Sequence, residues 1–211
     1  MAPFLMTEQF MMTLINEGSS QLGQGASGSV YLVKHEGEMA ALKVGKSKRQ
    51  CESFTKEREV LEIVNGAGGS PRVLGYCPDT PALLMTYCTG QDLFEVAEQG
   101  AGDRECLSIL VKTCQALQEV HQAGIVHCDL KPDNILVEMS EEGVAQEVHI
   151  IDFGLACSFG YAFLRRFNSN ERPWYCPCFF DGTPMQAPCD VLALAVTISY
   201  FSEVMSGECR G

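Results

Sequence analysis

The chain has 211 residues, of which 46% are hydrophobic and 20% charged, and its net charge is −12 at pH 7. A chain of this length buries roughly 70% of its unfolded surface, so we expect one large domain or two lobes and exclude a disordered chain or a peptide scaffold. The acidic balance argues against a nucleic acid or an anionic membrane as partner, because either needs a large face on which Lys and Arg outnumber carboxylates.

Eleven cysteines are scattered along the chain. Their number is odd and no Cys-x-x-Cys pair is present, which disfavours both a disulfide framework and a zinc site. The first 15 residues are rich in Met and Phe but lack the basic segment and cleavage site of a signal peptide. We therefore expect an intracellular protein, in the cytoplasm or the nucleus, whose reduced thiols act mostly as small core hydrophobes.

The first part of the chain is predicted to be rich in strands. Residues 1–16 form an N-terminal extension that we expect to be helical. Residues 22–33 have the pattern of a strand, a glycine-rich turn and a second strand, and residues 39–44 predict another. A helix is predicted over residues 52–64, followed by two strands within residues 73–87.

The later part of the chain is predicted to be mainly helical. Thr89-Gly90 marks the boundary between two lobes, residues 17–88 and 89–211. A long helix is predicted from residue 103 to residue 123. Its apolar face is expected to contain Leu107, Leu110, Cys114, Leu117 and His121. Residues 191–201 are too few to span a bilayer and predict a buried helix. Strands followed by helices indicate an α+β fold of two segregated lobes.

A glycine-rich sequence joins the first two predicted strands. Gly23, Gly25 and Gly28 form a G-x-G-x-x-G run that continues to Val30. In dinucleotide-binding turns such glycines lead into a helix, whereas here the chain continues into a strand. The motif therefore favours a hairpin that covers phosphate groups, with a plain flexible hairpin as the alternative.

A single Lys interrupts an otherwise apolar predicted strand. The ammonium group of Lys43 must meet water or an anion, which a nucleotide phosphate or a carboxylate would supply. On the following predicted helix, Glu57 shares the apolar face of Phe54, so its carboxylate is expected to point inward. Glu59 and Glu62 fall outside that face and are expected to be solvated.

The strongest motif lies in the second predicted lobe. Residues 127–134 read His-Cys-Asp-Leu-Lys-Pro-Asp-Asn, and an Asp-Phe-Gly run begins at Asp152, 18 residues after Asn134. Phosphoryl transfer needs a group that accepts the proton of the attacking hydroxyl, oxygen ligands for Mg²⁺, and cations that spread the negative charge. Candidates for these roles are Asp129, Asn134, Asp152, Lys131 and Lys43.

With these motifs in this order, the chain resembles the eukaryotic-type protein kinases from about Leu22 to Glu203. Lys131, two residues after Asp129, is similar to the serine/threonine branch. The resemblance implies a two-lobed fold, with an antiparallel β-sheet and one helix in the N-lobe and a mainly helical, shortened C-lobe. It also implies ATP and Mg²⁺ as bound groups and a protein as substrate.

The resemblance assigns a role to each matching residue. Asp129 would be the catalytic base and Lys131 would contact the γ-phosphate. Lys43 would hold the α- and β-phosphates and pair with Glu57. The Mg²⁺ ligands would be Asn134 and Asp152. The nucleotide contacts would be Leu22, Gly23, Gly25, Gly28, Val30, Ala41, Lys43, Met85, Tyr87, Cys88, Asp92 and Leu136.

Some of these positions carry a more specific expectation. In the family, the position of Met85 is the gatekeeper, and Tyr87 and Cys88 lie in the hinge whose backbone contacts adenine. Asp92 stands where a carboxylate often meets ribose. Cys88 and Cys157 are expected to be accessible thiols near the nucleotide. His127 is expected to pack beneath the Phe of the Asp-Phe-Gly run.

The sequence departs from the family pattern in its activation segment. Cys128 replaces the arginine that usually receives the activation-loop phosphate, so control by loop phosphorylation is not expected. Arg165 and Arg166 are possible substitutes for that arginine. Residues 172–178 match the end of the segment only loosely. Cys176 and Cys178 are expected to pack beside Trp174, because two ligands make no metal site.

The last motif begins at Asp190, which is expected to cap the backbone of the catalytic loop. The helix that follows resembles the central helix of the family's C-lobe, and the family's later helices have no counterpart in the sequence. An apolar face of this helix is therefore expected to be open to a partner or a second copy. Three functions remain open: an active serine/threonine kinase, a catalytically weak mimic that binds a kinase or its substrate, and a minimal kinase with an unusual or small-molecule substrate.

Overall fold

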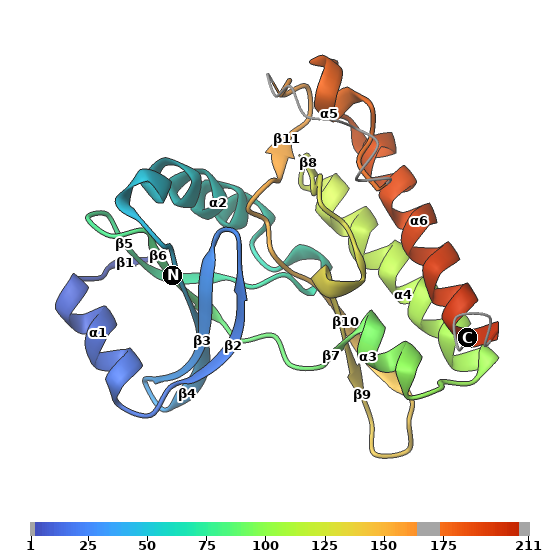
Figure 1. The fold of residues 1–211 in the computed structure, drawn as a ribbon, viewed down its shortest axis with the longest axis horizontal. Helices are drawn as coiled ribbons and strands as arrows, with labels where there is room; N and C mark the ends of the chain where they lie inside the picture. The colour runs from blue at the N-terminus through green and yellow to red at the C-terminus, as the bar shows by residue number, and fades with distance from the viewer. Residues whose placement is uncertain (1–2, 164–173, 207–211) are drawn as a thin grey trace. The chain divides into compact units, whose positions relative to one another are not determined.

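The computed structural model describes residues 3–163 and 174–206 (Figure 1). The chain divides into two compact units. The first consists of Met1–Gly66 and Pro71–Cys88, and the second of Ala67–Ser70 and Thr89–Gly211. The short insertion at residues 67–70 is the 3₁₀ turn η2 (Ala67–Gly69), which belongs to the second unit although the sequence around it belongs to the first.

The first unit is built on a six-stranded sheet in the order β1-β5-β6-β4-β3-β2. These strands are β1 (Phe4–Leu5), β2 (Ser20–Gly25), β3 (Gly28–His35), β4 (Glu38–Val44), β5 (Val73–Cys77) and β6 (Ala82–Thr86). The expected antiparallel pairing holds for five of the strands, and β1 alone pairs in parallel, with β5.

Helix α1 (Glu8–Asn16) covers one face of this sheet. It begins at Thr7, whose hydroxyl accepts a hydrogen bond from the backbone N–H of Phe10 at 3.1 Å. Met11 and Leu14 are buried among side chains of β3, β4 and β6. Residues near the N-terminus therefore complete the core of the first unit.

Helix α2 (Cys51–Val64) lies against the opposite face of the sheet, because Glu57 reaches Lys43 there. It follows the 3₁₀ turn η1 (Lys48–Gln50) and ends at Asn65, whose φ of 46° is a left-handed cap. Phe54 and Glu57 are buried and Glu59 is exposed, as the helical periodicity predicts. The strands and the helix predicted for this unit are confirmed within one or two residues at their ends.

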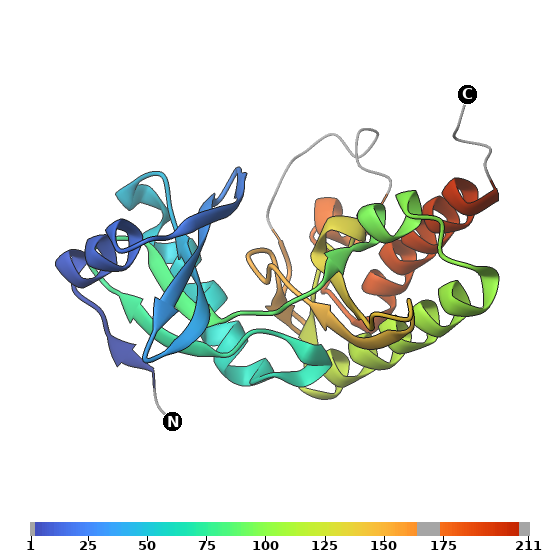
Figure 2. The same ribbon diagram turned by 90° about the horizontal axis from the view of Figure 1, so that it is seen from below.

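The second unit is mainly helical, with α3 (Leu93–Glu98), α4 (Asp103–Gln122), α5 (Cys178–Asp181) and α6 (Ala187–Ser206). Strands β7 (Gln91–Asp92), β9 (Ile135–Met139) and β10 (Ala145–Ile150) form one small sheet, and β8 (Ile125–Val126) pairs with β11 (Cys157–Ser158). A 3₁₀ turn, η3 (Pro132–Asn134), leads into β9. Helices α4 and α6 lie side by side in both views (Figures 1 and 2).

The extent of α4 is as predicted, but its predicted buried face is wrong. Leu107 and Cys114 are exposed, and only Leu117 of the expected set is fully buried. The residues that face the core are Cys106, Ile109, Thr113, Ala116, Leu117 and Val120. This face contains small and polar residues that carry little hydrophobic signal. Thr113 fits there because its hydroxyl donates to the carbonyl of Ile109 at 2.9 Å.

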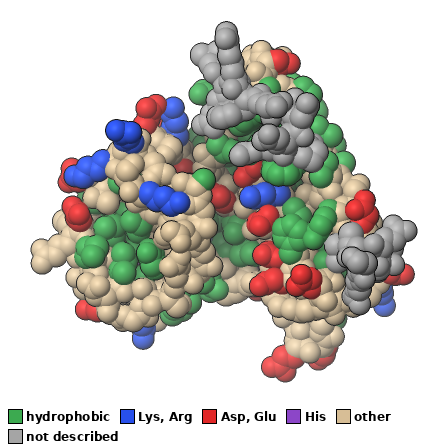
Figure 3. Space-filling view, viewed as in Figure 1, with side chains coloured by type: hydrophobic (Ala, Val, Ile, Leu, Met, Phe, Trp, Pro, Cys, Tyr) green, Lys and Arg blue, Asp and Glu red, His purple; other side chains and the backbone are tan. Residues whose placement is uncertain are grey.

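Helix α6 is buried on one side only. Ala193, Thr197 and Phe201 face the core, whereas the side chains of Val191 and Leu192 are 56% and 40% exposed. None of the helices in the described parts of the chain is long and apolar enough to cross a membrane. On the face shown in Figure 3, Lys and Arg side chains lie among Asp and Glu side chains.

The turn between β2 and β3 depends on one glycine of the glycine-rich run. Gly28 has a φ of 147°, and a Cβ atom there would lie 2.1 Å from the carbonyl oxygen of Val44. A Cβ at Gly25 would meet nothing within 4 Å. We expect Gly28→Ala to lower the free energy of unfolding by about 2–4 kcal/mol through overpacking and backbone strain. Gly25→Ala is the matched control and should change it by less than about 1 kcal/mol. Urea unfolding followed by circular dichroism measures both, and equal midpoints would contradict the argument.

Candidate functional site

The candidate residues of the first unit are arranged around a buried ion pair. The Nζ atom of Lys43 on β4 lies 2.6 Å from the Oε1 atom of Glu57 on α2. The two side chains are only 6% and 4% exposed, and Nζ lies 5.8 Å from the centre of the Phe54 ring. A buried charge is stable only with a partner, so each residue requires the other. The inward orientation of Glu57 predicted from helical periodicity and the pairing implied by the family resemblance are thus both confirmed.

Strand register brings three expected nucleotide contacts of this unit to the face of Lys43. Val30 lies directly opposite Lys43 on the neighbouring strand, and Ala41 lies directly opposite Met85. Directly opposed residues of antiparallel strands share a face, and Ala41 shares one with Lys43 by period-two alternation. Val30, Ala41 and Met85 therefore flank Lys43 on one side of the sheet.

The remaining candidates of the first unit are more exposed. Leu22 on β2 is 44% exposed, and a Cβ atom added at Gly23 or Gly25 would meet nothing within 4 Å. Tyr87 and Cys88, just after β6, are half-buried. The tight packing that requires glycine is confined to Gly28, so internal packing does not explain the other two glycines.

The second unit places two further candidates on adjacent strands. Asp92 on β7 lies directly opposite Leu136 on β9. The Oδ1 atom of Asp92 accepts a hydrogen bond from the backbone N–H of Glu95 at 2.9 Å and so caps α3. The cap gives Asp92 a structural role that the sequence reasoning did not assign.

The hairpin of β9 and β10 brings Asn134 and Asp152 to the same end of the small sheet. Ile135 lies opposite Ile150 in the antiparallel ladder, so the residues just before β9 and just after β10 are neighbours. The backbone N–H of Ile151 donates to the carbonyl of Asn134 at 3.0 Å. Two oxygen-bearing side chains 18 positions apart in the sequence are thereby held on adjoining backbone.

The loop before η3 holds Asp129 close to Asn134. The Nδ2 atom of Asn134 donates to the backbone carbonyl of Asp129 at 2.8 Å and lies 3.4 Å from its Oδ2 atom. Asn134 is almost fully buried and its amide nitrogen is directed at Asp129, so its carbonyl oxygen points elsewhere. Lys131 in the same loop is partly exposed, and its Nζ lies 3.9 Å from Asp133.

His127 contacts the loop that contains Asp129 and the Asp-Phe-Gly segment. Its ring packs edge-on against Phe153, with centroids 4.9 Å apart, as expected from the sequence. The Nε2 atom lies 3.0 Å from the carbonyl oxygen of Ile151, and Nδ1 accepts from the backbone N–H of Asp129 at 3.3 Å. A carbonyl can only accept, so the neutral ring with its proton on Nε2 satisfies both contacts.

Asp190 at the start of α6 fastens the loop to the helices. Its side chain is fully buried and accepts backbone N–H bonds from His127 at 2.7 Å and from Cys128 at 2.8 Å. The Nε2 atom of His121 on α4 lies 2.9 Å from the same carboxylate. The predicted capping role of Asp190 is confirmed, and Cys128 is held at a φ of 66° that a non-glycine residue seldom adopts.

Cys128 occupies an apolar cluster instead of carrying a charge. Its sulfur lies 3.5 Å from that of Cys157, which pairs through β11 with Val126 on β8. The contact with Cys157 and burial raise the pKa of the Cys128 thiol, so it stays protonated. The expectation that Cys157 is accessible is wrong, because the strand pairing buries it to 7% exposure.

Two aromatic residues that sequence reasoning gave no functional role contact the carboxylate of Asp129. The hydroxyl of Tyr175 donates to Oδ1 at 2.7 Å, and the Nε1 atom of Trp174 donates to the same oxygen at 3.3 Å. In the sequence, only the loose family match of residues 172–178 indicated that this segment lies near the site. Arg165 and Arg166, which the sequence suggested as substitutes for the arginine that Cys128 replaces, lie outside the described residues, as does Arg172.

Comparisons with known proteins agree with this arrangement. The protein kinase domain family matches residues 17–208. A serine/threonine-protein kinase of Drosophila erecta is 33% identical over 144 residues, which are 64% of this chain and 19% of that protein. A serine/threonine-protein kinase of Myxococcus xanthus is 31% identical over 149 residues, 64% of this chain and 21% of that protein. The chain thus spans about a fifth of the length of these curated relatives.

The Lys43–Glu57 pair makes a testable contribution to stability. Lys43→Met alone leaves the Glu57 carboxylate buried without its cation, and we expect a loss of about 3–5 kcal/mol in the free energy of unfolding. Lys43→Met combined with Glu57→Leu removes both charges and should recover most of that loss. Urea unfolding of the single and double variants measures the coupling. A double variant no more stable than Lys43→Met would contradict the expected energetic coupling of the pair.

Proposed function

Because the chain belongs to the protein kinase family, we propose that it is an ATP- and Mg²⁺-dependent kinase that transfers the γ-phosphate to Ser or Thr hydroxyls of a protein. The observation that carries this proposal is the loop of the second unit, where Asp129 and Asn134 are hydrogen-bonded to each other and Asn134 adjoins Asp152. The names of the relatives, which are serine/threonine kinases, support the hydroxyl class.

The side chains present suit both ATP and Mg²⁺. The amide oxygen of Asn134 and the carboxylate of Asp152 are the hard oxygen ligands that Mg²⁺ prefers. Lys43 would hold phosphate oxygens, with its position fixed by Glu57. The open space at Gly23 and Gly25 would allow the backbone to approach the phosphates closely. When bound, Mg²⁺ would offset the negative charge on the β- and γ-phosphate oxygens.

Each residue of the proposed site has one role in binding or in phosphate transfer. Asp129 accepts the proton of the attacking hydroxyl, and Asn134 keeps the Asp129 side chain oriented. Lys131 contacts the γ-phosphate and spreads its charge. Val30, Ala41 and Leu136 would contact adenine together with the backbone of Tyr87 and Cys88. Leu22 and Met85 would also contact the nucleotide, and Asp92 would contact the ribose.

We also propose that activity is not controlled by phosphorylation of the activation segment. Cys128 is buried in an apolar cluster, and its protonated thiol cannot pair with a phosphate. His121 and the backbone of the loop are already held by Asp190 without any added charge. The loop geometry therefore does not require a phosphate to form.

A second function is favoured by the contacts of Trp174 and Tyr175. Both residues donate to Oδ1 of Asp129, the carboxylate that the first proposal assigns as base. A chain that keeps these contacts would bind nucleotide but transfer phosphate slowly, and would act as a mimic that binds a kinase or its substrate. Transfer requires that one oxygen of Asp129 becomes open to the hydroxyl of the substrate.

Replacement of the proposed base separates these functions. We expect Asp129→Asn to lower the rate of phosphate transfer from labelled ATP to a generic protein substrate by on the order of 10²–10⁴-fold, the usual contribution of a general base. Asp103→Asn removes the same charge at an exposed position of the second unit and should leave the rate unchanged. Equal label incorporation by wild type and Asp129→Asn would refute the kinase proposal.

Tyr175→Phe tests whether the aromatic contacts restrain transfer. The change removes one charge-assisted hydrogen bond, worth about 1.5–3 kcal/mol, and keeps the ring that stacks on Phe179. We expect kcat to rise up to about tenfold, with a smaller change in the KM for ATP. Tyr161→Phe alters an exposed hydroxyl and is the control. An unchanged or lower kcat for Tyr175→Phe would mean that the contact does not hold the base closed.

A further inference from the structure

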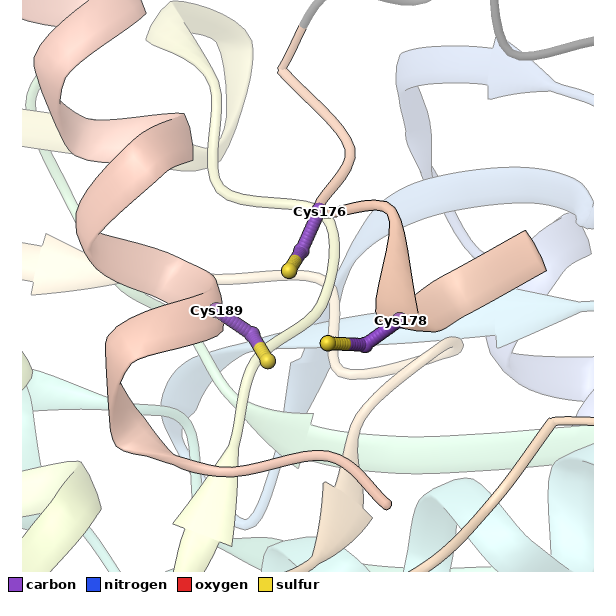
Figure 4. Close-up of side chains that lie close together, drawn as sticks. All are labelled: Cys176, Cys178 and Cys189. Carbon is purple, nitrogen blue, oxygen red and sulfur yellow. The ribbon is translucent and has the colours of Figure 1, made fainter. Parts of the chain in front are cut away.

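Three cysteines of the second unit converge on one point. Cys176 lies in the segment before α5, Cys178 is the first residue of α5, and Cys189 lies in the first turn of α6 (Figure 4). Their sulfur atoms all lie within 4.8 Å of one another, and the side chains point toward each other. The sequence offered only the pair Cys176 and Cys178, and the fold adds the third thiol from 11 residues further along the chain.

The surroundings hold the three thiols in place. Cys176 and Cys178 are half-buried and Cys189 is buried, beside Tyr175 and Phe179 in the same apolar cluster. The backbone N–H of Gln186 donates to the sulfur of Cys189 at 3.5 Å. A sulfur atom in such a place is shielded from solvent on one side and oriented by the backbone.

We propose that Cys176, Cys178 and Cys189 form a binding site for a thiophilic d¹⁰ cation of the Zn²⁺ class. Tetrahedral Zn²⁺ with Zn–S bonds of about 2.3 Å needs sulfur atoms about 3.8 Å apart, so the present cluster requires only small side-chain rotations. With three thiolates bound, the fourth coordination position of the cation is open to water or an added ligand. Mg²⁺ and Ca²⁺ are excluded from this site because they require oxygen ligands.

Burial raises the pKa of all three thiols, and two features oppose this effect. Cys189 lies in the first turn of α6, a 20-residue helix whose positive end favours a thiolate. The backbone N–H of Cys178 donates a hydrogen bond to the sulfur of Cys176. The backbone N–H of Gln186 likewise donates to the sulfur of Cys189. Contacts of this kind orient the ligands of metal sites and tune their affinity.

A second cluster in the described residues lacks these features. Glu138, Glu147 and His149 also lie close together on β9 and β10. Both ring nitrogens of His149 already have partners, the carbonyl of Gly69 at 2.8 Å and the carboxylate of Glu138 at 3.1 Å. Its imidazole therefore has no nitrogen left for a cation without breaking one of these contacts.

A cation bound to Cys176, Cys178 and Cys189 would link α5 to the start of α6. Cys178 and Cys189 belong to these two helices, and Cys176 directly follows Tyr175, which contacts Asp129. A bound cation would therefore fix the segment that carries Trp174 and Tyr175. The site itself depends only on the thiols and not on the proposed function of the chain.

Cobalt binding tests the site in the full, reduced chain. Co²⁺ replaces Zn²⁺ and gives a near-ultraviolet thiolate charge-transfer band whose intensity scales with the number of bound thiolates. We expect a band of three-thiolate intensity that saturates at one Co²⁺ per chain, is displaced by Zn²⁺ and is unaffected by excess Mg²⁺. Trp174 is the only tryptophan of the chain and lies two residues from Cys176, so its fluorescence should be quenched in parallel.

Matched variants assign the band to these residues. Cys176→Ser and Cys178→Ser should each weaken Co²⁺ binding by more than about tenfold and abolish the Trp174 quenching. Cys114→Ser, at an exposed thiol on α4, should change neither signal. Because Cys189→Ser alters a buried position, its fold is first checked by circular dichroism. The proposal is overturned if reduced wild type gives no thiolate band, or if Cys176→Ser and Cys178→Ser retain it at full intensity.

Discussion

The buried carboxylate of Asp190 is the contact on which the geometry of the second unit depends. It accepts hydrogen bonds from the backbone of His127 and Cys128 and contacts His121, so one side chain joins α4, the loop before η3 and α6. Its charge is stable at full burial only because these donors surround it. The two backbone hydrogen bonds to Asp190 hold Cys128 in a left-handed conformation that is strained for a non-glycine residue. This conformation sets the direction in which the chain reaches Asp129.

The first unit also depends on a buried carboxylate, that of Glu57 on α2. Lys43 and Glu57 are both buried, and removal of either would leave a charge without compensation. The register of β3, β4 and β6 then decides which side chains stand beside the ammonium group, since Val30 and Met85 oppose Lys43 and Ala41. In both units the contacts of a buried carboxylate fix the position of residues proposed for phosphoryl transfer, and apolar packing alone would leave them less well defined.

Most elements of the fold could be predicted because their signals are local. The strands of the first unit, α2 and α4 have clear periodicity and clear ends, and Asn65 ends α2 in a left-handed conformation. The buried face of α4 could not be found from hydrophobicity, since Thr113 faces the core through a hydrogen bond while Leu107 does not. Burial of Cys157 was also missed, because it results from pairing with Val126, 31 positions earlier in the chain.

The sequence by itself determined the order of the motifs, the family resemblance with the Lys43–Glu57 pairing that it implies, and the inward orientation of Glu57, because each depends on residue type at short or characteristic spacing. Only the tertiary structure decided that Tyr175 and Trp174 contact Asp129, and that Cys189 joins Cys176 and Cys178. These contacts unite segments that no local pattern connects. Their formation depends on how α5 and α6 pack against the loop, which is a property of the whole core of the second unit.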